Sequence, residues 1–243
     1  MSRVKVVAVS YLNTVPFIYG IERVSPLGRL SLSLAVPAAC ADILKKGEAD
    51  IALIPAAEVL QIPNYKVITD YCIAAEGAVD TVALLSNSQI LDIKRIYLDA
   101  DSRTSVLLVK ILAKEYWGIE PEWVDGIPLQ IKEGEGVMAI GDKVFEMEKV
   151  FAKKWDLAHE WQQMTGLPFV FAVWVATTER GKEFEDELNE ALKVGVENIA
   201  ASIPAKYDFQ KAYNYLINNI KFNLDEPKRE SLKIFWEKII TPG

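Results

Sequence analysis

Runs of apolar residues alternate with helical patterns along most of this chain. The apolar runs are VKVVAV, LSLSLAV, DIALIP, KVITDYCIAA, VDTVALLS, RIYLDA, VMAIGD and FVFAVWVAT. Many of them are continuous and lack strict apolar–polar alternation, which is typical of strands that are covered on both faces. The pattern therefore predicts an α/β protein.

Amphipathic segments separate these runs and then dominate the C-terminal third. SVLLVKILAKEYWG keeps its apolar residues on one helical stripe and ends at Gly118, a predicted C-cap. From Gly181 onward every segment has a helical period, with Asp208 as a predicted N-cap and Pro227 near a helix start. The C-terminal third is therefore predicted to be all-helical.

The order of the elements predicts two α/β lobes. Residues 1–87 together with 175–243 would form the first lobe, and residues 88–174 the second. The chain would cross between the lobes twice, once at about residue 87 and again through FVFAVWVAT. Two crossings would create a cleft between the lobes, and small ligands usually bind in such clefts.

Charge and composition exclude several classes of function. The 243 residues carry a net charge of −7, which argues against a nucleic-acid binder. A small anionic substrate stays possible, because a few local donors can dominate one cleft. Cys40 and Cys72 are expected to be buried free thiols, and no CxxC pair or His cluster suggests a metal site. The first apolar run is too short for a signal peptide or membrane span, so a cytoplasmic location is expected.

Four polar clusters follow predicted strands, where ligands of open α/β sheets bind. They are SYLNTVP at residues 10–16, LIPAAE at 53–58, DSRTS at 101–105 and AIGD at 139–142. In DSRTS, the first helical turn and the hydroxyls of Ser102, Thr104 and Ser105 would form an anion-binding site. Arg103 could add a bidentate contact to a carboxylate. The alternative is an ordinary N-cap with an exposed arginine.

Each of the other candidate side chains also has a structural alternative. Asn13 either holds a ligand by its amide or forms an Asx-type turn before Pro16. Asp142 is an acid, a base or, the favoured interpretation, a helix N-cap. Thr81 either aims its hydroxyl into the cleft or packs on a strand. His159 is the only histidine and is predicted to be a surface or packing residue, which argues against a Ser-His-Asp triad.

Taken together, five motifs resemble those of the chorismate dehydratase family, whose enzymes catalyse the first step of the futalosine pathway to menaquinone. In chain order they are SYLNTVPF, KKGEADIALIPAAE, LDADSRTS, IGD and TGLPFVFAVWV, and the resemblance covers roughly residues 4 to 178. It implies a two-lobed α/β fold like that of type II periplasmic binding proteins, with a ligand cleft between lobes and a helical C-terminal segment. It also implies a lyase that converts chorismate to 3-[(1-carboxyvinyl)oxy]benzoate and water, with no cofactor.

The resemblance assigns roles to particular residues. Asn13 matches the family's active-site asparagine, and Thr81 stands where relatives often have serine, so the hydroxyl is kept and a methyl is added. Residues 102–105 would seat a substrate carboxylate. Further substrate contacts are expected at Ser10, Tyr11, Pro55, Gly141, Asp142 and Phe169. Asp80 is an acid beside the anion site, and strand alternation predicts that it points to the face opposite Thr81.

Two questions stay open at the level of sequence. The general base is either Asp142 or, the favoured hypothesis, the enolpyruvyl carboxylate of the substrate itself, since the motifs offer donors and amides but no poised His or Glu. The rival functions are the related dihydroxynaphthoate synthase, which is expected to use a histidine near the cleft, and a solute-binding protein without chemistry. The sequence indicates no oligomeric state.

Overall fold

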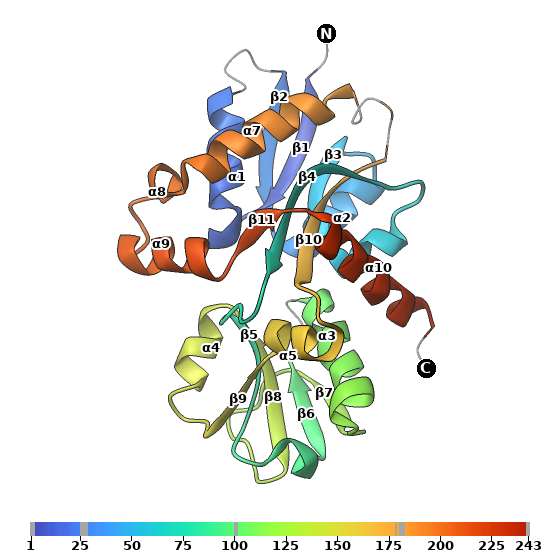
Figure 1. Ribbon diagram of the computed structural model, residues 1–243, viewed down its shortest axis with the longest axis vertical. Coiled ribbons are helices and arrows are strands. Elements are labelled where there is room, and N and C mark those ends of the chain that lie inside the picture. Colours follow the sequence, from blue (N-terminus) through green and yellow to red (C-terminus); the bar gives the residue numbers. More distant parts are fainter. Residues whose placement is uncertain (1–2, 25–28, 100–101, 178, 180–182, 242–243) are drawn as a thin grey trace. The chain divides into compact units, whose positions relative to one another are not determined.

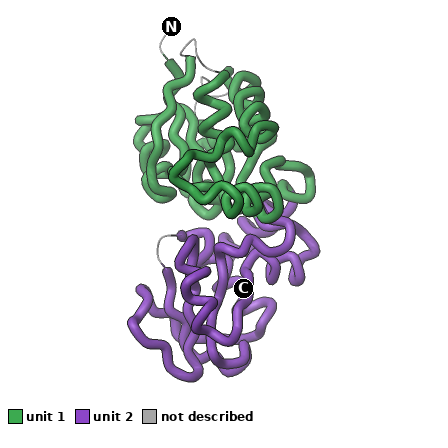
Figure 2. Tube along the Cα trace, turned by 90° about the vertical axis from the view of Figure 1, so that its left-hand side faces the viewer, with its two compact units in different colours: residues 1–74, 170–229 green, residues 75–169, 230–243 purple. Residues whose placement is uncertain are grey.

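The computed structural model describes residues 3–24, 29–99, 102–177, 179 and 183–241 (Figure 1). The chain forms two compact units, residues 1–74 with 170–229 and residues 75–169 with 230–243 (Figure 2). From the sequence we expected the chain to pass from one lobe to the other near residues 87 and 175, and these positions differ from the limits of the two units. The units also divide the C-terminal segment, because the chain from residue 230 onward belongs to the second unit.

The sheet of unit 1 has the strand order β11-β4-β10-β3-β1-β2 (Figure 1). Its strands are β1 (Val4–Val9), β2 (Leu30–Ala35), β3 (Ile51–Pro55), β4 (Lys66–Ala75), β10 (Phe169–Ala176) and β11 (Lys221–Asn223). β1 pairs in parallel with β2 and β3, whereas β10 runs antiparallel to β3 with Ala172 opposite Pro55. The carboxyl ends of β1, β2 and β3 therefore share one edge of the sheet.

Helices and short 3-10 turns complete unit 1. They are the turns Leu12–Thr14 and Ala56–Gln61, and α1 (Val15–Val24), α2 (Pro37–Lys45), α7 (Glu185–Glu197), α8 (Ile199–Ser202), α9 (Phe209–Asn218) and the start of α10 (Glu226–Ile240). The fully buried Phe17 of α1 packs edge-on against Tyr71, Trp174 and Phe222, with ring centroids 5.3–6.1 Å apart. This aromatic cluster joins α1 to the sheet.

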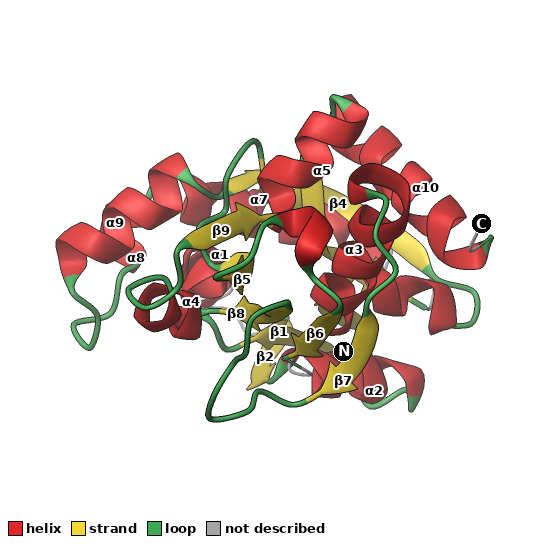
Figure 3. Ribbon diagram, turned by 90° about the horizontal axis from the view of Figure 1, so that it is seen from below, coloured by secondary structure: helices red, strands yellow, loops and turns green. Residues whose placement is uncertain are grey.

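The sheet of unit 2 has the order β7-β6-β8-β5-β9. Its strands are β5 (Val82–Ser86), β6 (Arg95–Leu98), β7 (Glu122–Asp125), β8 (Glu135–Ile140) and β9 (Lys153–Asp156). The helices are α3 (Arg103–Leu112), which continues into a π-helical turn at Ala113–Trp117, α4 (Asp142–Met147) and α5 (Leu157–Thr165). Figure 3 shows α3 and α5 side by side. The end of α10 joins this unit, where Trp161 Nε1–H donates to Ser231 Oγ at 2.9 Å.

The structure confirms the α/β class and most of the elements predicted from the sequence. Each of the eight apolar runs overlaps a strand. Gly118 ends its helix with φ 66°, Asp208 caps α9 by accepting from Lys211 N–H at 2.9 Å, and Pro227 lies in the first turn of α10. The all-helical prediction for the C-terminal third is wrong at β11, because three residues pair with the distant β4 and leave too short a pattern to detect.

The two cysteines are free and fully buried. Burial away from water raises the pKa of the Cys40 thiol to about 11 and raises the pKa of Cys72 further. Since the thiolate is the nucleophile, we expect neither thiol of the native protein to react with iodoacetamide at about pH 8. Mass analysis should find no adduct before denaturation and two adducts after it. Rapid labelling of the native chain would contradict this prediction.

Candidate active site

Three of the expected site residues lie at the carboxyl edge of the unit 1 sheet. Ser10 follows β1 directly, and its N–H donates to the carbonyl of Ala35 at the end of β2, at 3.1 Å. Ser10 and the next residue, Tyr11, are exposed. Pro55 is the last residue of β3 and is buried. The structure therefore brings the first two predicted polar clusters to one edge of one sheet.

Asn13 lies in the short turn that joins β1 to α1. It belongs to the 3-10 turn Leu12–Thr14, which is closed by the backbone bond from Thr14 N–H to the carbonyl of Tyr11 at 3.1 Å. The buried Thr14 also donates its hydroxyl to Asn13 Oδ1 at 3.3 Å. Because this bond engages the amide oxygen, the NH₂ group is the part of the half-buried Asn13 side chain best suited to bind a ligand.

The remaining polar clusters gather at the corresponding edge of the unit 2 sheet. β6 and β8 are parallel, with Leu98 opposite Met138, so their carboxyl ends lie together. β5 is antiparallel to β8 and therefore begins at the same edge. The bond from Gly141 N–H to the carbonyl of Thr81, at 2.7 Å, joins the start of β5 to the end of β8. Residues 102–105 of the third cluster follow β6 at this edge as well, and the first residue of that cluster, Asp101, lies outside the described residues.

The residues that open α3 form a capped helix start. Ser102 is the N-cap, and its Oγ accepts from Ser105 N–H at 3.2 Å and lies 2.8 Å from Ser105 Oγ. Thr104 and Ser105 are buried, whereas Arg103 is exposed. The N-cap interpretation is thus confirmed for Ser102. The helix end still offers a partial positive charge next to an arginine, which together favour an anion.

At the start of α4 the structure differs from the prediction. The N-cap is Gly141, with φ 66° and ψ −149°, and Asp142 is the first residue of the helix. The prediction of Asp142 as the cap is wrong because the chain turns here through a backbone conformation that glycine adopts without strain and a residue with a Cβ does not. Gly141 and Asp142 are both exposed.

Thr81 is the residue before β5 and therefore lies outside the strand. Its side chain is half-buried. Its neighbour Asp80 has φ 65°, in the left-handed region, and its carboxylate lies 3.6 Å from Lys154 Nζ. Strand alternation therefore does not decide where Asp80 points, contrary to the expectation. The ion pair with β9 gives its carboxylate a partner within unit 2.

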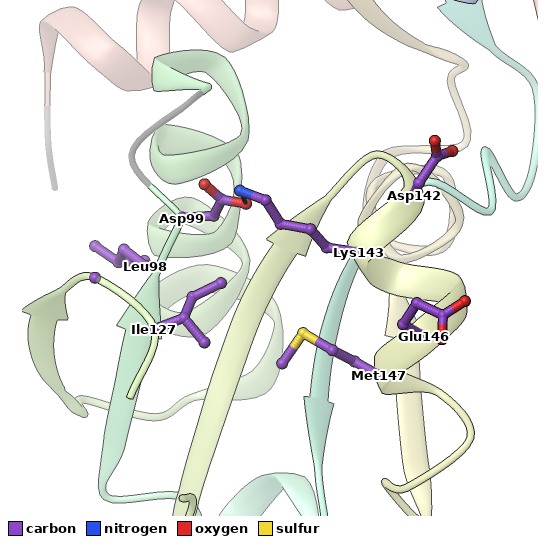
Figure 4. Close-up of a pocket in the computed structure, with 8 residues that line it drawn as sticks. Leu98, Asp99, Ile127, Asp142, Lys143, Glu146 and Met147 are labelled. Atoms are coloured by element: carbon purple, nitrogen blue, oxygen red, sulfur yellow. Dashed lines mark hydrogen bonds and ion pairs between the residues drawn. The ribbon is translucent and has the colours of Figure 1, made fainter. Parts of the chain in front are cut away.

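A pocket of about 700 Å³ opens at this edge of unit 2 (Figure 4). Its lining is Leu98, Asp99, Gly126, Ile127, Asp142, Lys143, Glu146 and Met147. Lys143 reaches across to the buried Asp99, with Nζ 2.8 Å from Oδ2, while Asp142 points away from that pair (Figure 4). Three carboxylates and one ammonium make the lining net negative. Of these eight residues, only Asp142 was predicted from the sequence as a site residue. Asp99 and Lys143 could have been found from their positions shortly after the ends of β6 and β8.

Two aromatic side chains that the sequence singled out lie elsewhere in unit 2. Phe169 is fully buried and packs edge-on against Trp161 and Phe235, with centroids 5.4 and 5.1 Å away. The structure thus gives the Phe169 ring packing contacts within unit 2. His159 is exposed on α5, in agreement with its prediction as a surface residue.

The described part of the chain contains no group of three or more His, Cys, Asp or Glu side chains arranged to hold a metal ion. Within the same residues, every helix is too short or too polar to cross a membrane. The donors at the two sheet edges are instead amides, hydroxyls, an arginine and helix ends. Such groups can orient an anionic organic molecule and stabilise charge that develops on it.

Sequence comparison relates the chain to proteins of menaquinone biosynthesis. The model of a family described as "Menaquinone biosynthesis" matches residues 4–240. A protein of Thermus thermophilus named chorismate dehydratase is 27% identical over 263 residues, which cover 93% of this chain and 96% of that protein. The likeness therefore extends through both units and is not confined to one motif.

Structural comparison supports the fold. A crystal structure of an Archaeoglobus fulgidus protein is similar with a TM-score of 0.73 and 15% identity, covering 97% of this chain and 96% of the other. A Candida albicans protein, described as exhibiting the generic periplasmic binding protein structural fold, has a TM-score of 0.58 and 13% identity over 98% and 91% of the two chains. These likenesses confirm the predicted periplasmic-binding-protein-like fold.

Proposed function

Because the chain belongs to the menaquinone biosynthesis family, we propose that it is a chorismate dehydratase, a lyase that converts chorismate to 3-[(1-carboxyvinyl)oxy]benzoate and water. The observation that carries the proposal is the end-to-end similarity to the Thermus thermophilus enzyme of that name. The polar loops at the two sheet edges supply the kinds of donor that this reaction needs. A cytoplasmic location is part of the proposal, because a biosynthetic enzyme acts where its substrate is made.

The proposed reaction is an elimination that makes the ring aromatic. The ring proton leaves the carbon that bears the ether, and the hydroxyl leaves the neighbouring carbon. The proton then passes from the base to the departing hydroxide, so that water is released and the base is restored. Asn13 would donate from its NH₂ group to the departing hydroxyl, and Thr81 would donate from its hydroxyl. Donors aimed at developing negative charge stabilise the transition state without rearranging during the reaction.

The charge distribution of unit 2 suggests where a substrate carboxylate binds. The net-negative pocket beside Asp142 would repel a dianion. The start of α3 instead combines the positive end of a ten-residue helix with the exposed guanidinium of Arg103. We therefore assign a carboxylate of the substrate to residues 102–105 and not to the pocket.

The base in this proposal is the enolpyruvyl carboxylate of the substrate. Replacing Asp142 by asparagine should consequently leave kcat within about threefold of wild type, whereas loss of a true general base costs about 10²- to 10⁴-fold. Steady-state turnover of chorismate measures the difference. Glu146→Gln is a matched control, since it removes the same charge from the same exposed helix and the same pocket lining. A large loss in Asp142→Asn alone would assign the base to the protein.

The function itself is tested by incubating the purified protein with chorismate. Ultraviolet absorbance should report an aromatic product, and mass analysis should find it lighter than chorismate by one water. Binding of chorismate without turnover would favour the solute-binding alternative. If chorismate neither binds nor reacts, the proposal is wrong.

A further inference from the structure

A buried carboxylate in unit 2 makes more bonds than its place in the fold requires. Asp156 ends β9 and is the N-cap of α5, with 8% of its surface exposed. Its Oδ1 accepts from Ala158 N–H at 3.1 Å and from His159 N–H at 3.2 Å. These two bonds satisfy the first turn of the helix and would be a sufficient structural reason for an aspartate here.

The same carboxylate also binds the loop before β5. Val79 N–H donates to Oδ1 at 3.2 Å, and Asp80 N–H donates to Oδ2 at 2.7 Å, the shortest of the four bonds. Capping α5 does not need these two bonds, because their donors lie more than seventy residues earlier in the chain. They fasten the residues immediately before Thr81 to the start of α5.

The fastened loop has a backbone conformation that needs support. Asp80 has φ 65°, a region that costs a residue with a Cβ of order 1 kcal/mol or more unless its surroundings hold it. β9 holds Asp80 at two points, through the bond of its N–H to Asp156 and through the ion pair of its carboxylate with Lys154 at 3.6 Å. The carbonyl of Thr81, one residue on, accepts from Gly141 N–H. The backbone on both sides of the Thr81 side chain is thus fixed by other elements.

We propose that Asp156 is a positioning residue, which holds the loop of residues 79–81 so that the Thr81 hydroxyl is aimed at the reacting substrate. The inference rests on the proposed function, in which Thr81 donates from its hydroxyl to the substrate. A displacement of about 1 Å at a catalytic group can cost on the order of 10²-fold in rate. A residue that touches no substrate can therefore control kcat through the loop it fastens.

The substitution Asp156→Ser separates the two roles of the carboxylate. Serine is a good N-cap, so α5 keeps its cap, but its hydroxyl is too short to bind Val79 and Asp80 as well. We expect kcat for chorismate to fall by about 10- to 100-fold with KM changed by less than about threefold. The matched control is Asp208→Ser, the same exchange at the cap of α9, which should leave both constants unchanged. Equal kcat in the two variants would overturn the inference.

A double-mutant cycle tests whether Asp156 acts through Thr81. In a Thr81→Val background the hydroxyl is already lost, so adding Asp156→Ser should lower kcat by less than about twofold. If the two losses multiply, Asp156 acts by another route and the inference fails.

Hydrogen exchange tests independently of catalysis whether Asp156 holds the loop of residues 79–81, an arrangement called here the clamp. The amides of Val79 and Asp80 should exchange faster in Asp156→Ser than in wild type or in Asp208→Ser. A wild-type protein without turnover would refute the proposed function, while unchanged exchange at these amides would refute the clamp. If the serine variant does not fold, Asp156→Asn replaces it. Asparagine has one acceptor oxygen instead of two, and faster exchange of the Asp80 amide with unchanged kcat would then overturn the inference.

Discussion

Replacing Asn13 by alanine is expected to lower kcat for chorismate dehydration by about 10²- to 10³-fold, with a much smaller change in KM. The bond from Thr14 to Asn13 Oδ1 directs the NH₂ group to serve as the donor, and alanine removes that donor. An interaction that strengthens as the hydroxyl departs contributes to the transition state more than to ground-state binding. Initial rates over a range of chorismate concentrations separate the two constants.

Two variants control this experiment. Asn214→Ala removes the same side chain from the exposed face of α9 and should have no effect on either constant. Asn13→Asp preserves the shape but replaces the NH₂ donor by an anionic oxygen, and against a dianionic substrate it should lose more activity than alanine does. Wild-type kcat in Asn13→Ala would show that the amide has no part in the elimination.

The sequence predicted the positions of the site loops well, for a physical reason. The apolar runs end at polar or turn-forming residues, as at Ser10 and Pro55, and parallel pairing brings the carboxyl ends of strands to one edge. Parallel pairing of the strands therefore gathers the loops that follow them, whereas Thr81 reaches the edge of the unit 2 sheet because β5 is antiparallel to β8 and starts there. The roles of the individual side chains in those loops stay predictions that the experiments above address.

What the sequence did not predict depends on contacts between distant residues and on single dihedral angles. The bond between Asp80 and Asp156 joins β9, a four-residue strand with two lysines, to a loop 76 residues away, and neither segment has a recognisable pattern. The cap at Gly141 depends on one positive φ. The ion pair of Lys143 with Asp99 joins the start of α4 to the residue after β6, and only the strand order of unit 2 brings these two segments together.

The residues at which the two units begin and end were also not predicted from the sequence. β4 and β10 are long apolar strands in which the units change at residues 74/75 and 169/170. Hydrophobic periodicity is continuous through these positions, because burial is needed on both sides of each boundary. The predicted crossing at about residue 87 lies just after β5, and the predicted limit at residue 175 lies near the end of β10.

Replacing Gly195 by alanine is expected to destabilise unit 1 by about 1–3 kcal/mol or more. A Cβ at this position would lie 1.8 Å from the carbonyl oxygen of Pro16 and 2.7 Å from its carbon, far inside van der Waals contact. The neighbouring atoms are backbone of α1 and cannot rotate aside. Gly20 of α1 is in the reciprocal position, because a Cβ there would lie 1.9 Å from the carbonyl oxygen of Ala191 in α7.

This prediction sets two effects of opposite sign against each other. Helix propensity alone would make Gly195→Ala stabilising by up to about 1 kcal/mol, because Gly195 lies in the last turn of α7. Urea denaturation decides, with the exposed Lys193→Ala on the same helix as the near-neutral control. A lower midpoint means that α1 and α7 must separate. Since α1 begins two residues after Asn13, the displacement of Pro16 should also reduce kcat in the folded fraction. A higher midpoint would mean that the two helices do not approach as closely as the glycines allow.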